Sequence, residues 1–346
     1  VSRYDGNTAK TYNLGGGASW ELEKFGKMTA AKRGAAAALQ GSRDYKQAVQ
    51  TRLIATIAIG YYTLVMLDTQ LEINGRTLDN WHNTVKTLEA LKKVGMSNEA
   101  GVLQAKSSVM ELEASRLTIL KSISETENAL SSVIAMPSQT IRRGTLEDAY
   151  FPDTISIGVP LQLLSNRPDV RNAEMNLAQA FYATNVARAA FYPSITLSGT
   201  LGWTNNGGGI VTNPGEWLLN AIGSLTQPLF NRGTNIANLK IAKTQQEEAR
   251  LLFQQSLLDA GKEVNDALTT WQTAKSQIEI SVRQVETLNE AVRKTQLLMR
   301  HSDTTYLEVL TAQQTLLDAE MALAQRRFDR IQAVINLYHA LGGGIN

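Results

Sequence analysis

The hydrophobic positions of one short segment alternate with period two. In "PSITLSGTLGWT" (193–204), four apolar residues fall on one side of an extended chain, and serines and threonines fall on the other. This alternation is typical of a β-strand with one polar and one apolar face. The apolar side consists of Ile195, Leu197, Leu201 and Trp203.

A second extended run, "EWLLNAIGSLTQPL" (216–229), follows a loop of turn residues, "NNGGGIVTNPG" (205–215). In this run Trp217, Leu219, Ala221, Gly223 and Leu225 share a side. Glycine, asparagine and proline between two alternating runs favour a hairpin. We therefore predict that the two runs pair as antiparallel strands.

Most of the remaining chain is rich in Ala, Leu, Gln, Glu and Lys and predicts long helices. Helices are expected from 28 to about 93 and from 235 to about 300, and neither segment contains proline. Each would extend for about 100 Å at 1.5 Å per residue. A short polar break follows each one, and returning helices are expected over 102–135 and 309–341. A long helix, a turn and a returning helix predict an antiparallel coiled hairpin.

The two halves of the chain resemble each other at a constant offset of 207 positions. "NLGGGASWELEKFG" (13–26) aligns with "NAIGSLTQPLFNRG" (220–233), and "VLQA" (102–105) aligns with "VLTA" (309–312). A fixed register over such a distance indicates an internal two-fold repeat. Residues 12, 14, 16 and 18 would then form a strand equivalent to the second run.

The predicted organisation has six parts. Residues 1–27 carry a strand of the first repeat, 28–136 the first coiled hairpin, 137–165 an irregular equatorial belt, 166–192 a helix leading to the sheet, 193–233 the strand hairpin, and 234–346 the second coiled hairpin. Pro168 suits a helix start, Asn166 is a possible cap, and Asp169 lies in the first turn.

The strands have two possible environments. A small sheet with one buried face shows the same alternation, but two long coiled hairpins cannot cover such a face in a compact core. Transmembrane β-barrels place apolar side chains towards lipid and polar side chains towards the lumen. Since strands cross membranes only in closed barrels, and this chain has few strands, copies of the chain are expected to close the barrel.

Composition argues against catalysis and nucleic-acid binding. The net charge is +2, cysteine is absent, and the three histidines (His82, His301 and His339) lack partners at metal-ligand spacing. The glycine triplets at 15, 207 and 342 do not have the spacing of a phosphate-binding loop. We expect a protein that is not an enzyme and has no cofactor and no bound metal.

Four segments show a resemblance to a known family. They are "SWELEKFGK" (19–27), "LLSNRPDVRNAEMNLAQAFYATNVARAAFYPSITLSG" (163–199), "PLFNRG" (228–233) and "NLYHALGGG" (336–344). The chain resembles the outer-membrane efflux proteins, the TolC-like exit ducts, and among them the OprM-like drug-efflux branch. Members of this family carry a strand and helices before the "SWELDLFG"-like segment. We therefore expect the chain to be part of a longer protein.

The resemblance implies a homotrimer in the outer membrane of a Gram-negative bacterium. Each subunit would give four strands to a twelve-stranded barrel, and the helices would form a periplasmic tunnel. A periplasmic adaptor protein and an inner-membrane transporter are the implied partners. The expected function is passive export of drugs or other small molecules by a tripartite pump. The alternatives are a type I protein-secretion duct and, in another class, a soluble coiled-coil scaffold.

The resemblance also implies where the sites lie. Leu307 and Thr311 would line the periplasmic constriction, where OprM-like ducts usually have leucine and aspartate. Because Thr311 departs from that pattern, the charge at the mouth is expected from Asp303 or Glu308. The positions expected to contact the adaptor are Gly95, Met96, Ser97, Asn98, Ser302, Thr304 and Thr305. The strand residues Ile195, Leu197, Leu201 and Trp203 are expected to face lipid.

Overall fold

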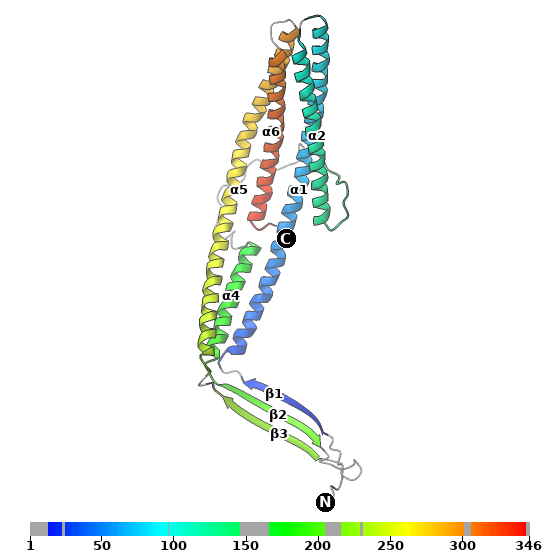
Figure 1. Ribbon diagram of the computed structural model, residues 1–346. Helices are drawn as coiled ribbons and strands as arrows, with labels where there is room; N and C mark the ends of the chain where they lie inside the picture. The colour runs from blue at the N-terminus through cyan, green and yellow to red at the C-terminus, as the bar shows by residue number, and fades with distance from the viewer. Residues whose placement is uncertain are drawn as a thin grey trace, which may run out of the picture. The chain divides into compact units, whose positions relative to one another are not determined.

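A computed structural model gives the fold, in which each half has a strand, a long helix and a returning helix in the same order (Figure 1). The structure describes residues 13–22, 25–95, 97–145, 166–204, 216–228, 231–300 and 306–343. The predicted hairpin loop (205–215) and most of the predicted belt (137–165) lie outside these residues.

Two helices of 67 residues dominate the chain, α1 (Lys27–Lys93) and α5 (Thr234–Arg300). Neither contains proline, so no backbone donor is lost along their length. Each is followed by a helix of 35 residues, α2 (Glu99–Val133) and α6 (Tyr306–Ala340). The predicted long helices are confirmed, but α2 and α6 begin three residues earlier than the sequence indicated.

A shorter helix, α4 (Pro168–Ala189), has Pro168 at its start and Asp169 in its first turn, as predicted. It leads into the three strands β1 (Asn13–Leu22), β2 (Ser194–Thr204) and β3 (Glu216–Thr226). The sheet order is β1-β2-β3, with both pairings antiparallel. The predicted hairpin of the second and third strands is confirmed.

The chain divides into two compact units. The first contains the sheet and combines Val1–Arg43 with Asn172–Gln255. In it, the Thr184 hydroxyl of α4 donates to the carbonyl oxygen of Ala242 in α5 at 3.1 Å. On its other side α4 approaches α1, because a Cβ added at Gly34 would lie 3.4 Å from Tyr182 Cβ.

The second unit combines Asp44–Arg171 with Ser256–Asn346 and consists of paired helices. Its apolar side chains form two clusters. One is centred on Leu64–Leu67 of α1 with Ile119, Ile123 and Phe328. The other, nearer the helix breaks, contains Trp81 and Leu88 with residues of α2 and α6. Burial of these stripes at helical spacing holds the hairpins together.

The helix ends of the two halves correspond at the offset found in the sequence. Lys27 and Thr234, Lys93 and Arg300, and Glu99 and Tyr306 are each 207 positions apart. Gly26 and Gly233, each one residue before a long helix, have φ angles of 78° and 77°. The left-handed conformation at this turn favours glycine in both halves.

The returning helices also end alike. In α2 the Met136 amide donates to the Ser131 carbonyl at 2.9 Å, and in α6 the Gly343 amide donates to the Tyr338 carbonyl at 2.9 Å. These are the long bonds of a Schellman motif, whose penultimate residue is left-handed. That residue is Gly342 (φ 75°) in α6 but Ala135 (φ 56°) in α2.

We expect Ala135→Gly to stabilise the protein by about 1 kcal/mol, because a left-handed alanine is strained and glycine is not. The matched change Gly342→Ala should destabilise it, since the new Cβ would also lie 3.2 Å from the Arg167 Cα. Thermal unfolding of the purified protein measures both effects. Equal shifts for the two variants would contradict this account of the helix ends.

Candidate functional site: a two-faced sheet and two helix-hairpin tips

The register of the sheet places apolar side chains of three strands on one face. Trp20, Leu197 and Gly223 occupy one row across the strands, and Leu14, Trp203 and Trp217 occupy another. Directly opposed residues of antiparallel strands project to the same side. The apolar face comprises residues 14, 16, 18, 20 and 22 of β1, residues 195, 197, 199, 201 and 203 of β2, and residues 217, 219, 221, 223 and 225 of β3.

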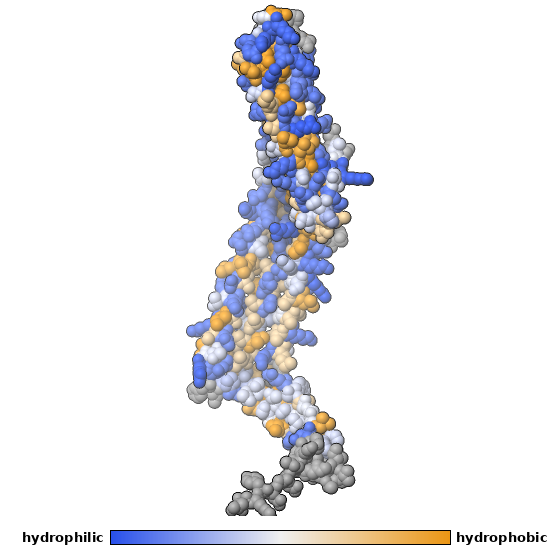
Figure 2. Space-filling model, turned by 45° about the vertical axis from the view of Figure 1, so that its right-hand side comes forward, coloured by the Kyte–Doolittle hydropathy of each residue, from blue (hydrophilic) through white to orange (hydrophobic). Residues whose placement is uncertain are grey.

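The described residues leave this apolar face largely uncovered. Trp20 is 62% exposed, Trp217 72% and Leu219 79%. Large side chains gathered on one exposed face mark an interaction surface. In Figure 2 the sheet is mostly pale, with few of the dark blue charged residues that cover the helices.

The opposite face carries hydroxyls that bond to the backbone. The Ser198 hydroxyl donates to the Ile222 carbonyl, and the Ser194 hydroxyl donates to the Thr226 carbonyl, both at 3.4 Å. Two apolar residues of β3, Leu218 and Ile222, also lie on this face and are 51% and 60% exposed. The alternation in the sequence predicts a polar face here, so Leu218 and Ile222 depart from that prediction.

The tip of the second hairpin presents two of the predicted gate residues. Leu307 is 58% exposed, Thr311 is exposed, and the two are four residues apart on one face of α6. Val309 and Leu310 between them are buried in the second cluster. Glu308 is exposed in the first turn of α6, where the helix dipole stabilises a carboxylate. Asp303, Ser302, Thr304 and Thr305 lie outside the described residues.

At the first hairpin tip, Gly95 has a φ of 77°, and its amide donates to the Lys92 carbonyl at 3.1 Å. The Asn98 side chain caps α2 by accepting from the Gly101 amide at 2.9 Å. Asn98, predicted as an adaptor contact, therefore has a structural role. Ser97 precedes this cap, and Met96 lies outside the described residues.

The two tips approach each other closely at Gly101. A Cβ at this glycine would lie 3.0 Å from the ring of Tyr306, the first residue of α6. Val102 and Ala105 of α2 are buried beside Val309 and Leu310. Gly101 and Tyr306 were not among the predicted site residues. They begin helices that are far apart in the sequence, and only the packing of those helices brings them together.

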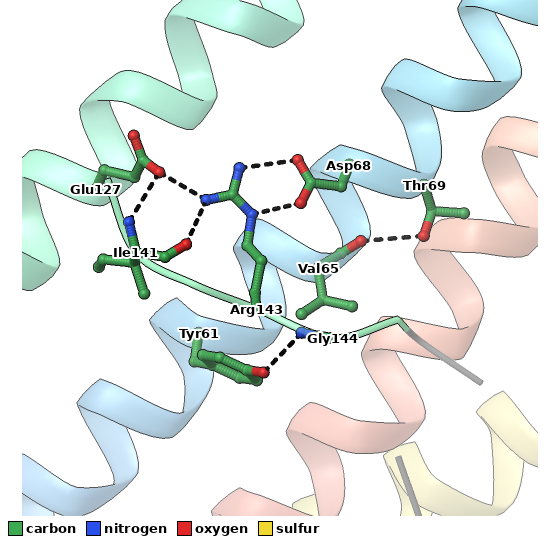
Figure 3. Close-up of polar contacts among 8 residues, drawn as sticks. All are labelled: Tyr61, Val65, Asp68, Thr69, Glu127, Ile141, Arg143 and Gly144. Carbon is green, nitrogen blue, oxygen red and sulfur yellow. Dashed lines mark hydrogen bonds and ion pairs between the residues drawn. The ribbon is translucent and has the colours of Figure 1, made fainter. Parts of the chain in front are cut away.

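Arg143, in the segment after α2, forms ion pairs with two helices (Figure 3). Its guanidinium forms a bidentate ion pair with Asp68 of α1 and donates to Glu127 of α2 at 2.6 Å. The Ile141 amide donates to the same Glu127 carboxylate, and the Gly144 amide donates to the Tyr61 hydroxyl at 3.1 Å. The hydrogen bonds with Asp68 raise the pKa of Arg143 above its ordinary value, so it stays charged.

Arg167, just before α4, also binds groups from several helices. It is 3% exposed, donates to Asp169 and to Glu263 of α5, and donates to the Ala340 carbonyl at the end of α6. Burial opposes ionisation of Asp169, but the hydrogen bonds from Arg167 outweigh it and lower its pKa below 3.8. The stability that this pair adds is present above pH 3.8 and is lost as the pH falls through the lowered pKa.

A sheet with an uncovered apolar face and two helices of 67 residues in one chain are typical of a membrane duct subunit with a helical tunnel. The chain belongs to the outer membrane efflux protein family, whose model matches residues 1–135 and 159–343. The predicted family, the mainly helical fold with a small membrane sheet, the efflux function and the outer-membrane location are confirmed.

Named relatives are similar in sequence over almost the whole chain. The cation efflux system protein CusC of Escherichia coli is 30% identical over 98% of this chain and 74% of its own length. The solvent efflux pump outer membrane protein SrpC of Pseudomonas putida is 27% identical over 98% of this chain and 73% of its own length.

Two solved structures match over almost the whole chain. A crystal structure of CusC has a TM-score of 0.91 at 28% identity, over 99% of this chain and 81% of that one. The open state of the MtrE outer membrane channel of Neisseria gonorrhoeae has a TM-score of 0.87 at 27% identity, over 100% of this chain and 79% of that one.

We expect Arg143→Gln to destabilise the protein by about 1–3 kcal/mol, because it leaves the largely buried Glu127 carboxylate without its cation. It should also speed proteolytic cleavage near Gly144. Arg142→Gln is the matched control, since Arg142 is the exposed neighbour. Thermal unfolding and limited proteolysis measure the two effects. If Arg142→Gln is as harmful as Arg143→Gln, the ion-pair cluster does not hold this segment.

Proposed function

We propose that the chain is one of three identical subunits of an outer-membrane exit duct. The observation that carries this proposal is the uncovered apolar face of a sheet whose outer strands, β1 and β3, each pair on one side only among the described residues. Unpaired strand edges are not viable in a hydrocarbon layer. Pairing of the edges between copies would satisfy them, and lipid would cover the apolar face. Twelve strands, four from each of three copies, is the closure that the family resemblance implies.

The proposed cargo is small molecules of several kinds. Relatives of similar identity are named for the efflux of cations, of solvents and for pyoverdine export, which favours a duct with little selectivity of its own. Passage through such a duct requires no catalytic group and no cofactor. Selection would then lie with an inner-membrane transporter and a periplasmic adaptor, as in the tripartite pumps of the family. Protein secretion and a soluble scaffold have no comparable support.

We propose that the helix tips form the periplasmic mouth. Leu307 and Thr311 are exposed, whereas Val309 and Leu310 between them are buried in the cluster that contains Trp81. The two exposed side chains are therefore available to line a constriction when three copies meet. Glu308, together with Asp303, would give the mouth an acidic ring, which favours cations. Adaptor contacts at Gly95, Met96, Ser97, Asn98, Ser302, Thr304 and Thr305 would stabilise the open tips more than the closed ones.

We expect Leu197→Arg to prevent assembly in the outer membrane, whereas Thr196→Arg is tolerated. Arginine on the lipid face near the bilayer midplane costs about 2–4 kcal/mol, and arginine on the luminal face remains in water. Thr196 is the matched control, because it is the neighbouring residue on the opposite face. The measurement is the amount of assembled trimer in outer-membrane fractions. Equal amounts for both variants would exclude the proposed orientation of the sheet.

We expect Leu307→Ala combined with Thr311→Ala to raise single-channel conductance in planar bilayers, because both side chains narrow the mouth. Asp303→Asn with Glu308→Gln should lower cation selectivity. Leu103→Ala is the control, since Leu103 is an equally exposed leucine (57%) on the other returning helix. If both double variants conduct like the control, the constriction lies elsewhere.

A further inference from the structure

One ion pair joins the two halves of the chain inside the second unit. The guanidinium of Arg76, on α1, donates to the carboxylate of Glu320, on α6, at 2.7 Å. The Glu320 side chain is 13% exposed, so the pair borders the packed contact between the two hairpins. Because the two halves are repeats of one another, the positions equivalent to this pair can be located in the other half.

The repeat carries the same two charges at the equivalent positions. The residue 207 positions after Arg76 is Arg283, on α5, and the residue 207 positions before Glu320 is Glu113, on α2. Both are exposed, and within the described ranges neither forms an ion pair. Arg283 donates to the Glu279 carbonyl of its own helix at 3.4 Å. The chain therefore repeats both charges on surfaces that its own fold does not bring together.

The apolar neighbours of the glutamate are covered in one half only. In α6, Leu317 and Ala324 lie on the same helical face as Glu320 and are buried in a cluster with residues of the first hairpin. Their equivalents in α2 are Met110 and Leu117, which are 65% and 68% exposed. The returning helix of the first half thus presents an apolar stripe of the kind that the returning helix of the second half buries.

The long helices differ in the matching way. Ile73 of α1, three residues before Arg76, belongs to the same buried cluster and is 8% exposed. Ile280 of α5, three residues before Arg283, is 58% exposed. The face of α5 that is equivalent to the packed face of α1 is therefore uncovered as well.

We propose that the uncovered face of α5 in one copy packs against the uncovered face of α2 in the next copy, as α1 packs against α6 within the chain. Arg283 of one copy would form an ion pair with Glu113 of the next, and the exposed apolar side chains of both helices would be buried around it. The inference rests on the proposed trimer and specifies which surfaces join its helical parts.

A second copy is the occupant that the repeat favours. The face of α5 carries the cation and the face of α2 the anion, and each has exposed apolar side chains beside its charge, so the two faces complement each other. A contact between two different faces closes into a ring when the rotation between copies fits. In a trimer, three contacts within chains would alternate with three contacts between chains.

The first test is crosslinking, which the absence of cysteine makes simple. We expect Arg283→Cys with Glu113→Cys, in the trimer purified in detergent, to give covalent dimers and trimers with a short bismaleimide. Arg76→Cys with Glu320→Cys is the matched control, because it should join within one chain, which peptide mass spectrometry detects, and add no covalent dimer. Arg283→Cys with Glu111→Cys should also give little dimer, since Glu111 is an exposed acid on another face of α2.

The second test reverses the charges. We expect Arg283→Glu and Glu113→Arg each to lower the temperature at which the trimer dissociates in detergent, because each places like charges in contact. Combining the two changes should restore the dissociation temperature of the parent. Combining Arg283→Glu with Glu111→Arg should not restore it.

An assembled trimer in which Glu113→Cys crosslinks no better than Glu111→Cys would overturn the inference and leave these faces to another occupant, such as the adaptor protein. A double charge reversal that is no more stable than the single variants would also overturn it. A parent that is not a trimer in the outer membrane would instead refute the proposed duct, and this inference with it.

Discussion

The apolar face of the sheet is the constraint on which the rest of the account depends. Three strands place tryptophan and leucine side chains in common rows, and the described chain leaves them largely exposed to solvent. Exposing such a face to water costs free energy in proportion to its apolar area. A membrane removes that cost but forbids open strand edges. Together these two requirements favour closure of a barrel by several copies.

The second unit, which consists of paired helices, has to bury apolar side chains along its length. Helices about 100 Å long cannot bury their side chains in a globular core, so they pair along apolar stripes. The stripes form two clusters along the second unit, and Arg143 and Arg167 fix the connecting segments to these helices. At the first hairpin tip Asn98 caps α2, and at the start of α6 the side chain of Leu307 is exposed.

Local pattern was enough to predict the long helices and the β2–β3 hairpin, because periodicity and turn residues define them. The starts of α2 and α6 were placed three residues late, since the cap at Asn98 precedes the apolar pattern. Leu218 and Ile222 were missed on the polar face, because "WLL" obscures the alternation there. Arg143 and the Gly101–Tyr306 contact join residues far apart in the chain, which a single sequence does not pair.

The most direct test of the account uses the absence of cysteine from the chain. Single cysteines placed in turn at residues 195–201 of β2 can be labelled in intact outer membranes with a water-soluble maleimide. The account predicts alternation, with labelling at positions 196, 198 and 200 and protection at 195, 197 and 201. Uniform labelling, or protection at the even positions, would contradict it.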